Sequence, residues 1–212
     1  MTPNNQCVFI VDDDASVRDS LAVLLGLKGY RTQAFASAED FLRNYRLEEG
    51  GCLLLDVRMP GMSGVELQSA MRERQIRLPI IVITAHGDVP TARAALVAGA
   101  VDFLEKPVDP ELLLATVRTA LDGDAARRSA TRRMREESRK LDVLTARERQ
   151  IMELIAEGTH YREIATTLGI SPRTVEGHKA RVMDKLQIRN VTELVHLVLG
   201  ASGAAKPGNF KG

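Results

Sequence analysis

The first 121 residues alternate between short apolar runs and stretches with the apolar spacing of an amphipathic helix. The runs predict β-strands at Val8–Val11, Arg31–Phe35, Cys52–Leu55, Ile80–Thr84 and Val101–Leu104. The helical spacing predicts helices at Ala15–Lys28, Ala38–Tyr45, Gly64–Arg74, Pro90–Ala98 and Pro110–Leu121. Regular alternation of this kind is typical of a parallel sheet covered by helices on both faces. We therefore predict an α/β, doubly wound, five-stranded parallel domain over residues 1–121.

The pattern changes twice after this region. Residues 122–143, DGDAARRSATRRMREESRKLDV, are polar and basic, and predict a linker that is either flexible or a solvated helix continuing the one before it. Residues 144–200 have helical periodicity throughout and predict a separate all-α domain of four helices. Residues 201–212 lack an apolar period and predict a disordered tail.

Within the second domain, one stretch has the layout of a helix-turn-helix unit. A short helix over Tyr161–Leu168 is followed by Gly169, and a second helix begins after the N-cap Ser171. Val175 and Val182 share one apolar face of that second helix. By spacing alone, this pattern more often reflects ordinary helix packing than DNA binding.

Composition narrows the class of protein. Apolar residues are 44% and charged residues 27% of the chain, as in globular proteins. No apolar run reaches the roughly 18 residues that span a bilayer, and no signal peptide opens the chain, so we expect a cytoplasmic protein without membrane contact. Cys7 and Cys52 are expected to be buried thiols.

Charge separates the two halves of the chain. Residues 1–121 hold 12 Lys/Arg and 16 Asp/Glu, a net charge of −4. Residues 144–212 hold 10 and 7, a net charge of +3. The two halves should therefore bind different partners.

Polar residues gather where the predicted strands end. Asp12 and Asp13 follow the first strand, Asp56 the third, and Lys106 the fifth, while Thr84 ends the fourth. The carboxyl ends of parallel strands meet at one edge of the sheet, where ligands bind. A single Asp after a strand is usually a turn former or a helix cap, and Asp14 fits that role.

Three converging carboxylates repel one another unless a cation joins them. Mg²⁺ favours carboxylate oxygens and often shares phosphate oxygens. A carboxylate beside Mg²⁺ and a lysine can act as a nucleophile toward phosphorus and form an aspartyl-phosphate. The pattern therefore predicts a Mg²⁺-dependent phosphoryl site.

These residues stand in motifs that resemble the receiver domain of bacterial two-component response regulators. The motifs are the Asp12-Asp13 pair, DVRMPGMSG with Asp56, ITAHG with Thr84 and DFLEKP with Lys106. The resemblance implies that Asp56 accepts the phosphoryl group and that Lys106 contacts it. It implies Thr84 and Phe103 as a switch pair. It also implies Mg²⁺ bound by Asp12, Asp13, Asp56 and the backbone carbonyl of Arg58.

Residues 143–200 resemble the LuxR-type DNA-binding domain of the FixJ/NarL class of response regulators. The matching stretches are LTARERQIMELIAEG, REIATTLGISPRTVEGHKARVMDKL and TELVHLV. Where that family commonly has Asn-Lys before EIA, this chain has Tyr161-Arg162. The DNA contacts that we expect from the helix position and the resemblance are Ser171, Arg173, Thr174, Glu176, Gly177, His178, Lys179, Arg181 and Lys185.

The leading hypothesis is a DNA-binding response regulator that is not an enzyme. A sensor histidine kinase phosphorylates Asp56, and the phosphorylated protein forms a homodimer that binds double-stranded promoter DNA. Two alternatives stay open: a phosphatase or phosphotransferase that uses Asp56 as its nucleophile, and a DNA-binding protein whose acidic pocket no longer functions.

Overall fold

A computed structural model describes residues 6–46, 50–85 and 89–202 of the chain. The chain divides into two compact units, residues 1–128 and residues 129–212. Residues 203–212, most of the predicted tail, lie outside the described residues. Each unit is described by itself below.

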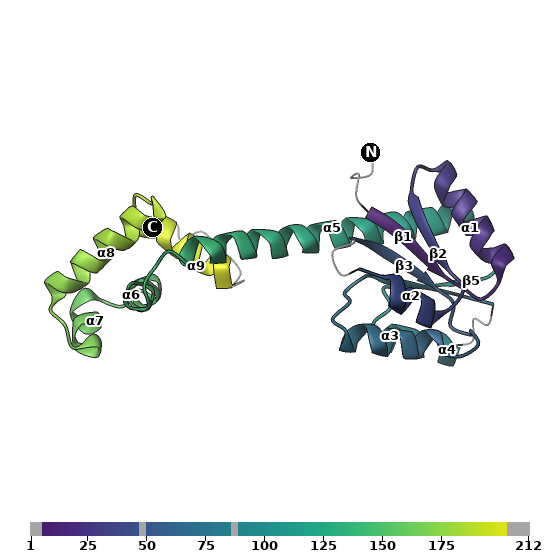
Figure 1. Cartoon of the computed structure of the whole chain (residues 1–212), viewed down its shortest axis with the longest axis horizontal. Coiled ribbons are helices and arrows are strands. Elements are labelled where there is room, and N and C mark those ends of the chain that lie inside the picture. Colours follow the sequence, from purple (N-terminus) through teal and green to yellow (C-terminus); the bar gives the residue numbers. More distant parts are fainter. Residues whose placement is uncertain (1–5, 47–49, 86–88, 203–212) are drawn as a thin grey trace. The chain divides into compact units, whose positions relative to one another are not determined.

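The first unit is built on a five-stranded sheet in the order β2-β1-β3-β4-β5 (Figure 1). All neighbouring strands are parallel. This arrangement confirms the predicted doubly wound α/β fold. The strands are β1 (Gln6–Val11), β2 (Arg31–Phe35), β3 (Gly50–Leu55), β4 (Ile80–Thr84) and β5 (Asp102–Glu105). Their bounds differ from the predicted ones by at most two residues.

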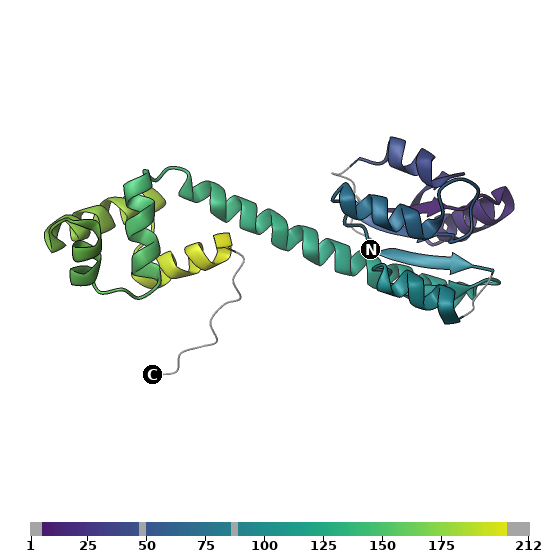
Figure 2. The same cartoon turned by 90° about the horizontal axis from the view of Figure 1, so that it is seen from below.

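Helices cover both faces of this sheet (Figure 2). They are α1 (Ala15–Leu27), α2 (Ala38–Asn44), α3 (Gly64–Glu73), α4 (Val89–Val97) and α5 (Pro110–Leu141). Alternate residues of β3 point to opposite faces, so Leu53 packs in a core with α2, α3 and α4, while Leu54 packs in a core with α1 and α5. Strands buried on both faces read as continuous apolar runs in the sequence. Cys7 and Cys52 are both buried thiols.

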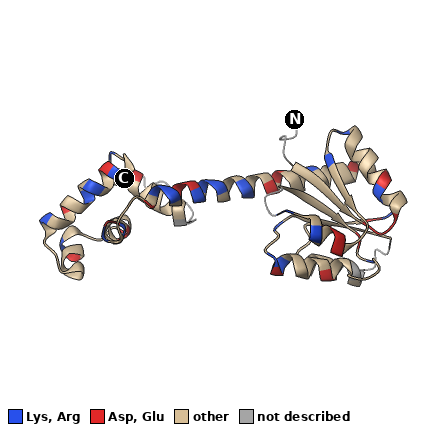
Figure 3. Ribbon diagram, in the orientation of Figure 1, with Lys and Arg blue, Asp and Glu red and all other residues tan. Residues whose placement is uncertain are grey.

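The apolar pattern predicts that the helix beginning at Pro110 ends near Leu121. In the structure, α5 continues through the polar segment to Leu141. Of the two predicted forms of this segment, a flexible linker and a solvated helix, the structure has the helix (Figure 3). Asp124 supports the continuation: its buried carboxylate accepts a hydrogen bond from the backbone amide of Gly51 at 3.0 Å and pairs with Arg127. The first turns of the polar segment are thus attached to β3.

The second unit is all-α, as predicted. Four helices follow the end of α5: α6 (Ala146–Ala156), α7 (Tyr161–Leu168), α8 (Pro172–Leu186) and α9 (Val191–Ser202). Thr145 and Glu148 form the capping box that begins α6, and Gly169 ends α7 in the left-handed conformation. Leu141, Ile151, Ile164, Val175 and Leu194 are buried together, one from each helix.

Candidate functional site

The acidic residues meet at the carboxyl-terminal edge of the sheet. Asp12 directly follows β1 and Asp56 directly follows β3, and these strands are neighbours. Both side chains are buried, whereas Asp13 is exposed. One carboxylate oxygen from each of Asp12, Asp13 and Asp56 lies within 4.8 Å of the others.

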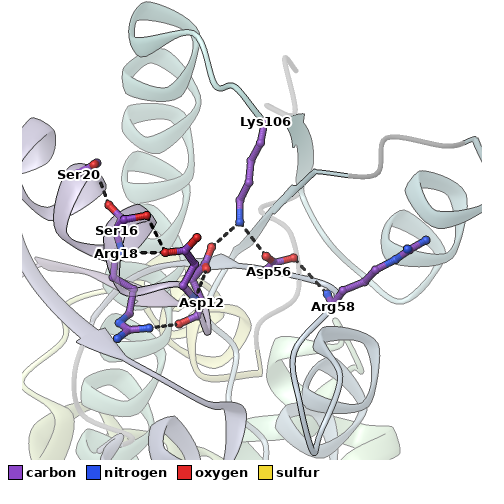
Figure 4. Close-up of polar contacts among 8 residues, drawn as sticks. Asp12, Ser16, Arg18, Ser20, Asp56, Arg58 and Lys106 are labelled. Carbon is purple, nitrogen blue, oxygen red and sulfur yellow. Dashed lines mark hydrogen bonds and ion pairs between the residues drawn. The ribbon is translucent and has the colours of Figure 1, made fainter.

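Lys106 reaches into this cluster from the loop after β5 (Figure 4). Its Nζ donates hydrogen bonds to Asp12 Oδ2 and Asp56 Oδ2, both at 2.7 Å. The Lys106 amide also donates to the Thr84 carbonyl at 2.9 Å, and the Lys106–Pro107 bond is cis. The ammonium thus bridges two carboxylates that lie 44 positions apart in the sequence, at 12 and 56.

Proton affinities reflect this crowding. Burial raises the pKa of the Asp12 carboxyl, and the hydrogen bond from Lys106 offsets the rise only in part. Burial alone would lower the pKa of Lys106, but hydrogen bonds to Asp12 and Asp56 outweigh it and raise that pKa. Lys106 therefore stays a cation at neutral pH and cannot serve as a general base.

Backbone groups orient the two buried acids. The Arg58 amide donates to Asp56 Oδ1 at 3.1 Å, and the Asp14 amide donates to Asp12 Oδ1 at 3.0 Å. Asp14 is the N-cap of α1, since its side chain accepts from the Ser16 amide at 2.8 Å, as the sequence predicts. Hydrogen bonds from Ser16 lower the pKa of Asp14.

The same cluster fits a hard divalent cation. Three carboxylate oxygens this close form an oxygen-only donor set, which Mg²⁺ favours. Asp12, Asp13 and Asp56 would hold the ion, and it would neutralise negative charge on a phosphoryl group. The role of the Arg58 carbonyl as a further ligand stays a prediction.

The proposed switch residues lie on the neighbouring strands. Thr84 is buried at the end of β4, beside the loop that carries Lys106. Phe103 pairs with Val82 across β4 and β5 and is half-buried against the core under α4. The structure therefore places Thr84 on β4, the strand next to β3, and Phe103 on β5, the edge strand of the sheet.

The second candidate site is the outer surface of α8. Val175 and Val182 are fully buried, which confirms the predicted core face. Ser171 begins the helix: its hydroxyl accepts from the Thr174 amide at 3.1 Å. Of the predicted DNA contacts, Ser171, Arg173, Thr174, Glu176, Arg181 and Lys185 are exposed, while Gly177, His178 and Lys179 are half-buried.

Two of the predicted contacts also have partners within the unit. Lys185 Nζ lies 2.7 Å from Oε2 of the buried Glu148. The hydrogen bond from Lys185 and that from the Thr145 amide lower the pKa of Glu148 to about 2. Lys179 Nζ lies 5.3 Å from the ring centroid of Tyr161, a cation–π contact.

Three structural features were not predicted from the sequence. They are the ion pair of Glu148 with Lys185, the burial of Asp124, and the hydrogen bond from Arg18 to the Asp12 carbonyl at 2.6 Å. Thr145 and Glu148 have the sequence spacing of a capping box, but that spacing does not indicate that Glu148 is buried. The Glu148–Lys185 pair and the burial of Asp124 depend on segments that the tertiary fold brings together, whereas Arg18 and Asp12 lie only six positions apart.

Comparison with known families assigns both units. Residues 8–118 match the family described as response regulator receiver domain, and residues 142–198 match the bacterial regulatory proteins of the luxR family. The chain belongs to the FixJ/LuxR-type response regulators, which are DNA-binding transcriptional regulators of two-component systems.

Individual relatives match over nearly the whole chain. The transcriptional regulatory protein FixJ of Azorhizobium caulinodans is 41% identical over 95% of this chain and 96% of its own length. The transcriptional regulatory protein TdiR of Thauera aromatica is 41% identical over 95% of this chain and 88% of its own.

Solved structures agree with this assignment. The response regulator StyR is 42% identical, with a TM-score of 0.79 over 92% of this chain and 98% of its own. Full-length FixJ from B. japonicum is 37% identical, with a TM-score of 0.56 over 96% of this chain and 100% of its own. Among the described residues, no helix combines the length and the apolar composition that crossing a lipid bilayer requires.

Proposed function

We propose that a sensor histidine kinase phosphorylates Asp56 and that this phosphorylation promotes dimerisation and promoter binding. The observation that carries the proposal is the Asp56 carboxylate, held at the sheet edge between Lys106 and two further acids. An Asp56 oxygen would attack phosphorus, forming an O–P bond as the N–P bond to the kinase histidine breaks. Bound Mg²⁺ would offset the phosphoryl charge.

The new phosphoryl group would change the contacts around Lys106. Its oxygens would compete with Asp12 for the Lys106 ammonium and offer an acceptor to the Thr84 hydroxyl. Thr84 would move toward the phosphoryl group and Phe103 would turn inward behind it. The backbone hydrogen bond between Lys106 and Thr84 supports this coupling, because it already joins the two strand ends.

The surface beyond this switch supports dimerisation. Leu96 and Val97 on α4, Val101 before β5, and Leu112 on α5 are large apolar side chains exposed to solvent. Exposed apolar side chains favour association with another surface. A movement of Phe103 would alter the last two helix–strand units, to which these side chains belong.

The proposed DNA contacts lie on the exposed side of α8. A Cβ at Gly177 would meet no protein atom within 4 Å, so packing inside the unit does not require this glycine. A small residue here suits close approach to base edges in the major groove. Lys179, Arg181 and Lys185 would contact phosphates.

The decisive experiment measures DNA binding and dimerisation with and without a small phosphodonor and Mg²⁺. The wild-type chain should gain both on treatment, and Asp56→Asn should gain neither. A phosphodonor response that persists in Asp56→Asn would refute the proposal. Stoichiometric labelling of the wild type without turnover of a phosphate ester would exclude the enzymatic alternative.

A further inference from the structure

The last turns of α5 carry an arginine stripe, which we define as Arg132, Arg135 and Arg139. Their spacing of i, i+3 and i+7 places them on one face of the helix. All three are exposed, and within the described part of the chain no acidic side chain pairs with any of them. Figure 3 shows how densely Lys and Arg occupy this stretch of α5.

The opposite face of the same turns packs within the second unit. Leu141 is buried in the core of that unit. Glu137 lies against α9, because a Cβ at Gly200 would come within 1.8 Å of its carboxylate. Glu137 also pairs with Arg133 at 3.6 Å. With one face occupied by these contacts, the arginine stripe is directed away from α9 and toward solvent.

Exposed arginines without acidic partners suit a polyanion. Residues 129–141 contain five Lys/Arg and two Glu, a net charge of +3. The stripe spans about 10 Å at 1.5 Å per residue, while duplex DNA presents one phosphate per about 3.4 Å of axis on each strand. Several phosphates therefore fit along it, and arginine donates to phosphate oxygens in bidentate geometry.

We infer that the arginine stripe of α5 binds the phosphate backbone of DNA, as a second contact beside that of α8. The second unit already belongs to a DNA-binding family, so a polyanion is available to the stripe. Phosphate contacts are independent of base sequence and release counterions. The stripe should therefore strengthen binding to any duplex without altering base preference.

The test compares two double variants of the full chain. Arg132→Gln with Arg135→Gln removes two charges from the stripe. Arg133→Gln with Lys140→Gln removes the same charge from another face of the same turns. Glutamine retains helix propensity in both. Circular dichroism and thermal unfolding check that each variant folds.

The readout is the salt dependence of binding to a labelled random-sequence duplex. The slope of log K against log salt concentration is negative, and each lost phosphate contact makes it less steep by about 0.9. The stripe variant should lose about 1.8 in slope, and the control variant should match the wild type. A stripe variant with the wild-type slope, or a control variant with an equal loss, would overturn the inference.

Two further arms separate other failures. Failure of the wild type to bind any duplex would remove the DNA-binding function itself, and the stripe with it. The second arm measures binding of the wild type and the stripe variant to polyglutamate, which tests whether the stripe binds an acidic protein instead of DNA. If the stripe variant loses polyglutamate binding but keeps wild-type DNA binding, the stripe serves an acidic protein and the inference is wrong.

Discussion

At the scale of single residues, two groups of buried carboxylates each bind a lysine ammonium. Asp56 and Asp12 share the Lys106 ammonium, and Glu148 holds Lys185 in the second unit. A buried carboxylate that loses its cationic partner destabilises the folded state, so both groups depend on close contact with their lysine. The Lys106 cluster is the proposed site of the phosphoryl group, whereas the Glu148–Lys185 pair joins α6 to α8.

The Glu148 pair predicts a specific dependence on pH. The pKa of the Glu148 carboxyl is lowered from the usual 4.5 to about 2 in the folded chain. A lowered acid pKa contributes stability above the unfolded value, and that contribution is lost as pH falls from about 4.5 toward 2. Lys185→Met should therefore raise the Glu148 pKa toward 4.5 and start acid unfolding of the second unit at higher pH.

Carboxyl ¹³C NMR of Glu148 measures the pKa, and the Thr145 amide signal follows unfolding. Arg181→Met, an exposed change on the same helix, is the matched control and should leave the pKa of Glu148 unchanged. An unshifted pKa in Lys185→Met would contradict the proposed pairing. It would also leave the Lys185 ammonium available for a phosphate contact.

At the scale of elements, strand ends explain why the acidic site could be predicted. Asp12, Asp56, Thr84 and Lys106 each follow or end a strand, and parallel topology brings those ends together without further information. The length of α5 could not be predicted in the same way, because a solvated helix has no apolar period. The Glu148–Lys185 pair needs the packing of α6 on α8, which local sequence does not contain.

The start of α3 is predicted to be intolerant of a side chain. A Cβ at Gly64 would lie 2.4 Å from the Asp56 carbonyl oxygen. Gly64→Ala should therefore displace the segment after Asp56, destabilise the chain by about 1–3 kcal/mol and slow Asp56 labelling. Denaturant unfolding and phosphodonor labelling measure the two effects.

Gly26→Ala in α1 is the control for that change. A Cβ there meets nothing within 4 Å, so the substitution should stabilise α1 by about 0.5–1 kcal/mol. Equal effects of the two substitutions on stability and labelling would show that the close approach of α3 to Asp56 has no consequence.

The packing of α8 makes a second prediction at this scale. Val182 is fully buried, and its neighbour Arg181 is exposed. Val182→Ala should lower the free energy of unfolding by about 2 kcal/mol. Arg181→Ala should leave stability within about 0.5 kcal/mol and lower the DNA salt slope by about 1. Reversed effects would mean that the faces of α8 are misassigned.

At the scale of the whole chain, two units with separate cores are joined through α5. The proposed phosphoryl site lies in the first unit and the proposed DNA contacts lie in the second. Coupling through dimerisation requires no contact between the two sites, because pairing two DNA-binding modules raises affinity by effective concentration. Under this proposal, the response would depend on the exposed apolar side chains of α4 and of the residue before β5, which are Leu96, Val97 and Val101.

Charges on that surface should separate phosphorylation from its effect. Val97→Lys with Val101→Lys places cations on the proposed dimer surface, where like charges from two copies repel. Asp56 labelling by a small phosphodonor should be unchanged, while phosphorylation-dependent dimerisation and the gain in DNA affinity should be lost.

Val23→Lys with Leu27→Lys adds the same charge to exposed apolar positions of α1 and is the matched control. Labelling, light scattering and DNA titration should all follow the wild type in this control, apart from a small electrostatic gain in affinity. If the α4 variant still dimerises on phosphorylation, the dimer surface lies elsewhere. If it stays monomeric yet still gains DNA affinity on phosphorylation, dimerisation is not how Asp56 controls DNA binding.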